Sequence, residues 1–305
     1  MSVTTSTRAI RTGTAGAMIQ SSCSWTLATS RFPRRLTAVV CGVLMLFCTS
    51  EALAELMLYP TRIVFKGNQR AAQLELINNG SQSATYRISL VNRRMDETGA
   101  FSDIETPQPG EQFSDSMLRY SPRQVTLAPG AGQTVRIMVR KPGNLAAGEY
   151  RSHLLFTQLP EAKGRSSIET RNDKGIGIVL NTLLGISIPV IVRHGNTDAD
   201  VALTQLELQH LPRGQSLLAL QMERSGNQSV YGDLAASFTP KGGAEQIIGR
   251  ANGVAVYTPN PLRRAKLRLD PPGGLQLANG VLRITYREQA EDGGELLAEA
   301  VLQLP

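Results

Sequence analysis

The sequence predicts an all-β protein made of two β-sandwiches behind a cleavable leader. Short segments alternate between apolar and polar residues, which is the period of a half-buried strand. Turn-forming residues separate these segments, and no helical period is found after residue 54. One segment alternates for 17 residues, 176–192, although an ordinary strand has about five or six.

The first 54 residues are typical of a leader. Two arginines precede an apolar run at 36–48, and Ala52-Leu53-Ala54 is a small-x-small cleavage site, so a secretory signal peptide cut after Ala54 is expected. The run is shorter than the roughly 20 residues of a spanning helix, so no membrane span is expected in the mature form. Residues 1–33 are interpreted as a disordered extension or the product of an upstream start codon, with Met18 as the alternative start.

The composition of the remaining chain disfavours several classes of function. All three cysteines precede Ala54, which leaves no thiol for disulfides, metal binding or catalysis. The leader carries five of the 32 Lys and Arg residues and one of the 25 Asp and Glu residues, so its removal lowers the net charge from +7 to about +3. A charge this small gives little support for nucleic-acid binding. The histidines lack metal-ligand spacing, and no nucleophile or phosphate-loop motif occurs. We therefore expect no cofactor, no metal and no enzymatic activity.

Residues 55–194 are predicted to form the first domain, a sandwich of the immunoglobulin class. About seven strands occur at short spacing, and Asn78-Asn79-Gly80 is a strong turn signal. A polar loop at 161–174 leads into the last and longest strand. The expected strands are 57–65, 72–77, 85–91, 123–127, 134–139, 150–159 and 176–192.

Residues 195–305 are predicted to form a second, smaller sandwich after a linker that begins at His194. Its alternation is weaker, and Pro259 and Pro261 predict a turn within 254–262. The expected strands are 202–208, 217–223, 234–238, 254–258, 265–269, 282–286 and 297–302.

The 17-residue segment is too long for one ordinary sandwich. Its even positions are large aliphatic residues except for Thr182, which is β-branched. Either the segment bends and serves two domains, or part of its apolar edge is meant for another polypeptide. An exposed apolar edge promotes aggregation, so some cover is expected in the free protein, and a self-capping dimer is one form that such cover could take.

Three segments resemble the periplasmic pilus chaperones of the PapD type. They read LYPTRIVFKGNQRAAQLELINNG, YSPRQVTLAPGAGQTVRIMV and GEYRSHLLFTQLP, and with the long strand they span nearly all of residues 55–195. The second domain agrees in size and class only. The resemblance implies a boomerang-shaped, non-enzymatic chaperone of the periplasm. Such a chaperone lends a strand to pilin or fimbrial subunits and delivers them to an outer-membrane usher.

The resemblance also implies roles for particular residues. Arg62 matches the arginine that holds the subunit's terminal carboxylate, and Glu149 and Arg193 match charged residues that fix the angle between the domains. The family's second cleft cation is a lysine, and Pro189 stands at that position, so a cation from another segment could substitute. Proline removes a ladder hydrogen bond, so the strand is expected to bend or become an edge there. The expected donor residues are Ile176, Ile178, Leu180, Thr182 and Leu184.

Each assignment has a plainer alternative. Arg62 could be a surface arginine on a strand, and the donor residues could belong to the core of the first domain. The alternative function is a secreted two-domain immunoglobulin-like structural or adhesion protein. Such a protein needs neither a long alternating strand after a polar loop nor an arginine in its first strand.

Overall fold

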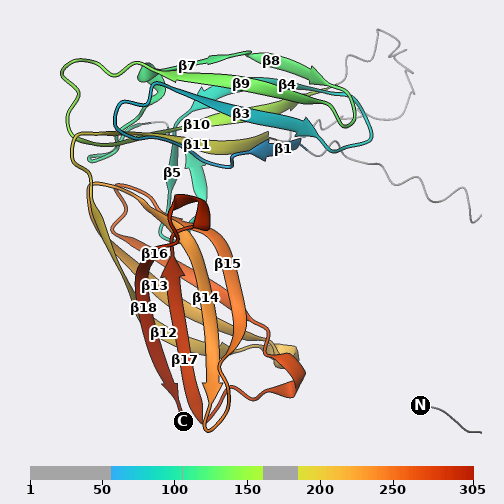
Figure 1. The fold of residues 1–305 in the computed structure, drawn as a ribbon, viewed down its shortest axis with the longest axis vertical. Coiled ribbons are helices and arrows are strands. Elements are labelled where there is room, and N and C mark those ends of the chain that lie inside the picture. Colours follow the sequence, from blue (N-terminus) through green and yellow to red (C-terminus); the bar gives the residue numbers. More distant parts are fainter. Residues whose placement is uncertain (1–55, 105, 161–184) are drawn as a thin grey trace, which may run out of the picture. The chain divides into compact units, whose positions relative to one another are not determined.

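The computed structural model describes residues 56–104, 106–160 and 185–305, all of which lie in one compact unit, Ala52–Pro305. Within these ranges every regular element is a β-strand or a three-residue 3-10 turn (Figure 1). The all-β prediction is therefore confirmed for the described part of the chain. No helix found there is long and apolar enough to cross a membrane.

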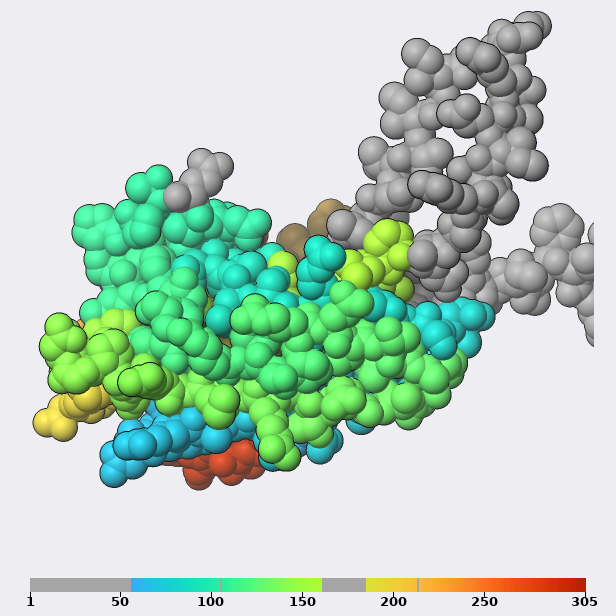
Figure 2. Space-filling model, turned by 90° about the horizontal axis from the view of Figure 1, so that it is seen from above, coloured from blue at the N-terminus to red at the C-terminus, as the bar shows by residue number. Residues whose placement is uncertain are grey.

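The first sandwich consists of two sheets with strand orders β1-β3-β9-β7 and β2-β11-β10-β4-β8. All pairings are antiparallel except that of β2 with β11, which is parallel. Figure 2 looks onto this sandwich, whose surface is formed by the blue to green part of the chain. Its strands are β1 (Leu56–Tyr59), β2 (Ile63–Phe65), β3 (Ala71–Asn78), β4 (Ala84–Val91), β7 (Leu118–Ser121), β8 (Gln124–Leu127), β9 (Gly132–Val139), β10 (Gly148–Leu159) and β11 (Gly185–His194).

Alternation places the core of this sandwich as the sequence predicts. Every second residue of a strand faces the opposing sheet, and these residues are apolar and buried. Full burial of one such side chain contributes about 1.5–3 kcal/mol relative to exposure. The residues with at most 1% exposure are Phe65, Leu74, Leu76, Val135, Ile137, Leu154, Phe156, Val190 and Val192.

The turn predicted at Asn78 is held by the buried side chain of that residue. Its Nδ2 donates to the carbonyls of Leu127 (3.0 Å) and Gln82 (2.7 Å), and its Oδ1 accepts from the Gly80 N–H (3.0 Å). A buried amide with three partners costs little in desolvation. The asparagine therefore fixes the β3–β4 turn and ties it to the end of β8.

The second sandwich has sheets β12-β13-β16 and β15-β14-β17-β18. Its core contains Met222, Phe238 and Tyr286, all fully buried, and the Tyr286 hydroxyl donates to the carbonyl of Val254 at 2.7 Å. Its strands are β12 (Ala199–His210), β13 (Ser216–Gly226), β14 (Val230–Pro240), β15 (Gln246–Val256), β16 (Leu262–Leu269), β17 (Gly280–Arg287) and β18 (Leu296–Leu304).

Several strands differ from the expectation. The strand expected at 57–65 is two strands, β1 and β2, separated at Pro60, because proline has no N–H for a ladder. The strand β15 begins at Gln246, well before the expected 254, and its glycines and register shifts obscure the alternation. Strand β7 and the short hairpin of β5 (Arg93–Met95) and β6 (Phe101–Asp103) were not predicted.

The long alternating segment is described only from Gly185 onward, as β11. Pro189 lies inside this strand opposite His153, and the register with β10 is continuous from Gly185 to His194. On its other side β11 pairs with β2 only at residues 190–192. Within the described residues, 185–189 therefore form an edge, which is one of the two expectations for this proline.

Candidate functional site

A row of charged residues lies on the face of β10 that points away from the sandwich core. Glu149, Arg151 and His153 alternate with Tyr150, Ser152 and Leu154, so the two sets face opposite sides of the sheet. All three members of the charged row are nevertheless buried, with exposures of 2%, 8% and 2%. Other segments must therefore cover this face, and the contacts below show which ones do.

Glu149 and Arg193 form a buried ion pair across β10 and β11. The Arg193 Nε lies 3.0 Å from Glu149 Oε2, and their side chains keep 13% and 0% of their exposure. Arg193 Nη2 also donates, at 3.2 Å, to the carbonyl of Ser229, which directly precedes β14 of the second sandwich. The pair thus reaches from the first sandwich to the second.

Ser229 completes this network from the second sandwich. Its backbone N–H donates to Glu149 Oε2 at 3.1 Å, and its hydroxyl donates to Glu149 Oε1. The hydroxyl also accepts from the Thr258 N–H at 3.0 Å. No local sequence pattern marks a serine for such a role, because its function depends on a residue 80 positions away.

Arg62 directly precedes β2 and is engaged by two residues of the second sandwich. Its Nη2 lies 2.7 Å from Asp292 Oδ2, and its guanidinium carbon lies 4.0 Å from the ring centroid of Tyr231. The Arg62 side chain keeps 11% of its exposure and that of Asp292 keeps 30%. The residue predicted to bind a foreign carboxylate therefore already binds one of the chain's own.

Arg151 is a buried guanidinium with incomplete hydrogen bonding. Its guanidinium carbon lies 4.3 Å from the ring centroid of Tyr257 and 5.9 Å from that of Phe101. Its Nε and Nη1 have no hydrogen-bond partner among the described residues. Burial lowers the pKa of Arg151, but arginine stays charged at any physiological pH. A buried charge without hydrogen bonds is costly, so this position suits an incoming anion.

Arg151 belongs to a basic cluster that we define as Arg93, Arg151, His153 and Arg263. In the described part of the chain, seven buried side-chain N and O atoms lack a partner, and six of them belong to this cluster. Burial, followed by the neighbouring charges of Arg151 and Arg93, lowers the pKa of His153 to about 3, so its imidazole is neutral at physiological pH. The cluster was not predicted, because its members lie on three segments, β5, β10 and β16, that are far apart in the sequence.

The β5–β6 hairpin covers part of this cluster and joins it to the second sandwich. The Phe101 ring packs edge-on against His153, with centroids 5.3 Å apart. The Met95 carbonyl accepts from Asn260 Nδ2 at 2.6 Å, and the Glu97 carbonyl accepts from the Arg264 N–H at 2.6 Å. The hairpin therefore makes the face of β10 a buried site rather than an open surface.

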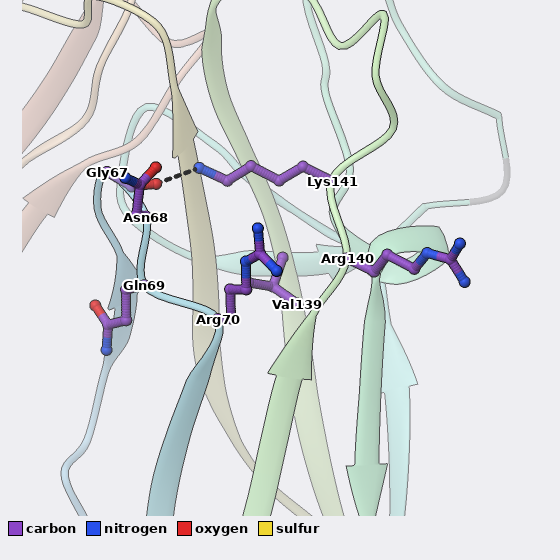
Figure 3. A pocket seen from close by; sticks show the side chains of 7 residues that line it. All are labelled: Gly67, Asn68, Gln69, Arg70, Val139, Arg140 and Lys141. Atoms are coloured by element: carbon purple, nitrogen blue, oxygen red, sulfur yellow. Dashed lines mark hydrogen bonds between the residues drawn. The ribbon is translucent and has the colours of Figure 1, made fainter.

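Lys141 is a lysine near the end of β11, and its contacts are structural. It lines a pocket of about 330 Å³ beside the turn at Gly67, where Figure 3 shows it reaching toward that turn while Arg140 points away. Its Nζ donates to the carbonyls of Gly67 (3.1 Å) and Arg193 (2.7 Å), and burial lowers its pKa. Lys141 therefore ties the end of β9 to the β2–β3 turn and to the end of β11.

Two groups of predicted residues lie outside the described residues. They are the signal peptide and the donor residues Ile176, Ile178, Leu180, Thr182 and Leu184. Their roles stay predictions. Among the residues that the structure does describe, no group of three or more His, Cys, Asp or Glu side chains could hold a metal ion.

No family model matches the chain, and no curated protein matches its sequence. Solved structures of pilus chaperones are similar to it over most of its length. A chain of the CsuC–CsuE chaperone–tip adhesion subunit complex of Acinetobacter baumannii is 14% identical, with a TM-score of 0.42, and the match covers 83% of this chain and 100% of that one. The CupB2 chaperone of Pseudomonas aeruginosa is 12% identical, with a TM-score of 0.39 and coverage of 81% and 100%. A chain of the SafA pilin–SafB chaperone complex of Salmonella enterica is 16% identical, with a TM-score of 0.37 and coverage of 83% and 97%. At these identities and TM-scores the function of this chain is inferred from its own residues.

Proposed function

We propose that this protein is a periplasmic, non-enzymatic chaperone that captures pilus or fimbrial subunits by lending them a β-strand. The observation that carries this proposal is the edge of β11. Residues 185–189 pair only with β10 within the described residues, and the sequence before them continues the same apolar alternation back to position 176. An edge strand with one apolar face is what strand donation requires.

The burial of β11 supports two different roles along the alternating segment, one in the core and one in binding a subunit. Ile188, Val190 and Val192 face the core and are at most 3% exposed, whereas Ile186, which belongs to the same even-numbered series, is 44% exposed. The core therefore ends between Ile186 and Ile188. Even positions earlier in the series are proposed to fill the groove of a subunit, and they are Ile176, Ile178, Leu180, Thr182 and Leu184.

The terminal carboxylate of the subunit is proposed to bind between Arg62 and Arg151. Arg62 borders the β2 side of β11, and Arg151 lies on β10 at the other side of that strand. A guanidinium can bind both oxygens of a carboxylate, and the unpartnered Nε and Nη1 of Arg151 supply such donors once the residues that cover them, Phe101 and Tyr257 among them, move aside. Arg151 thereby takes the place of the lysine that Pro189 replaces. Delivery to an outer-membrane usher belongs to the same proposal.

Arg62→Ala is expected to abolish capture of a subunit while leaving the protein folded. The change removes one of two proposed carboxylate ligands and only one ion pair of the native structure. The assay is co-purification, from the periplasm, of a small secreted subunit encoded beside the gene. Arg136→Ala, which removes an exposed arginine of β9, serves as the control and is expected to capture as the wild type does. If Arg62→Ala co-purifies the subunit at wild-type yield, Arg62 does not bind the terminal carboxylate of the subunit.

The same assay separates the proposal from the alternative of a structural or adhesion protein. An adhesion protein would purify without a subunit even when one is co-expressed. A chaperone should form a soluble complex of defined stoichiometry.

A further inference from the structure

The charge of Arg62 is already paired, and the partner is a carboxylate from the second sandwich. We infer that Asp292 is an internal ligand of Arg62 that an incoming carboxylate must displace, so that Asp292 sets the affinity and selectivity of capture. The inference rests on the proposed function, because it assumes that Arg62 binds the subunit's terminal carboxylate. It adds a residue of the second domain to that site.

The chemistry of the contact favours exchange. An aspartate side chain and a chain terminus present the same planar group to a guanidinium. The ion pair joins one nitrogen of Arg62, Nη2, to one oxygen of Asp292, Oδ2, at 2.7 Å. A free chain terminus can engage a guanidinium with both oxygens, so it competes well against this single bond. A neutral or internal segment of a partner offers no such group and leaves Asp292 in place.

The position of Asp292 makes its release inexpensive. It ends the 3-10 turn η4 (Ala290–Asp292) in the loop between β17 and β18, and Gly293 and Gly294 follow at positive φ values of 124° and 69°. No residue of η4 is buried. A largely exposed loop has little packing to lose when one side chain turns away.

Arg62 itself is held in place without Asp292. Its guanidinium lies over the Tyr231 ring at 4.0 Å, and the first residues after it are locked in β2 against β11. The arginine therefore remains presented when the carboxylate is exchanged. This arrangement fits a competitor better than a residue that is needed to position Arg62.

The direct test measures carboxylate binding by Asp292→Asn. The probe is N-acetylglycine, a minimal chain-terminal carboxylate, and its amide is the uncharged control. Binding is followed by the NMR shift of the Arg62 Nε–H during titration. Because the probe must displace Asp292 from Arg62 in the wild type, Asp292→Asn should bind the probe about fivefold more tightly than the wild type. Glu291→Gln removes the same charge from the neighbouring exposed position and should bind as the wild type does.

Equal or weaker binding by Asp292→Asn, in a variant whose melting temperature is unchanged, would overturn the inference. Weaker binding would show that Asp292 positions Arg62 instead of competing for it. Co-purification with a subunit separates this failure from failure of the proposed function. If the wild type captures the subunit and Asp292→Asn captures no more of it, only the inference fails, whereas absence of capture by the wild type and by Asp292→Asn alike rejects the proposed function.

Discussion

Glu149→Ala is expected to lower the free energy of unfolding by about 3–5 kcal/mol, the usual cost of removing one partner of a buried ion pair. The Glu149 side chain has no exposure and accepts bonds from Arg193 and from the N–H and hydroxyl of Ser229. Its loss leaves a guanidinium at 13% exposure without its carboxylate. Urea denaturation of the purified protein measures the change.

An exposed ion pair provides the matched control. Arg268 and Asp270 lie 2.9 Å apart, but their side chains keep 65% and 67% of their exposure. Asp270→Ala should therefore change the free energy of unfolding by less than about 1 kcal/mol. A similar small effect from Glu149→Ala would show that the network with Ser229 does not stabilise the fold.

Arg151→Met is expected to reduce capture of a subunit by at least about tenfold without destabilising the protein. Replacing a poorly satisfied buried charge with an apolar side chain of similar length removes a desolvation cost, so the free energy of unfolding should stay equal or rise by about 1 kcal/mol or more. The aromatic contacts of Arg151 with Tyr257 and Phe101 can be kept by a methionine. Stability retained together with binding lost is typical of a functional charge.

Two measurements on one preparation make this test decisive. Urea denaturation gives stability, and co-purification gives capture. Arg136→Met, at an exposed position of β9, should leave capture unchanged. If Arg151→Met captures the subunit normally, Arg151 does not bind the carboxylate. If the free energy of unfolding of the variant instead falls by several kcal/mol, the guanidinium of Arg151 stabilises the contact between the two sandwiches in the wild type.

Local patterns in the sequence were sufficient to predict most of the strands. Alternation over 72–77 and 134–139 depends on which side of a strand is buried, and the structure places strands β3 and β9 there. The three-residue strands β5 and β6 are too short for a period to appear. The bulges of β15 broke the alternation that the prediction needed.

The site was predictable only where a family resemblance supplied the residues. Glu149 and Arg193 were named in advance, and the structure joins them at 3.0 Å. Ser229 and Asp292 could not be found in this way, since they act through contacts with residues 80 and 230 positions away. Burial of Arg151 likewise depends on Tyr257 and Phe101, which come from other segments.

We propose that this chain holds a subunit by its free terminal carboxylate next to a donated strand. The most direct measurement is the affinity of the wild-type protein for one subunit in two forms, with its native C-terminus and with that terminus extended by two glycines. A carboxylate moved away from Arg62 and Arg151 loses its ligands, so the extended subunit should bind at least about tenfold more weakly, a loss of about 1.4 kcal/mol. Equal affinity for the two forms would show that the chain does not hold the subunit by its terminal carboxylate.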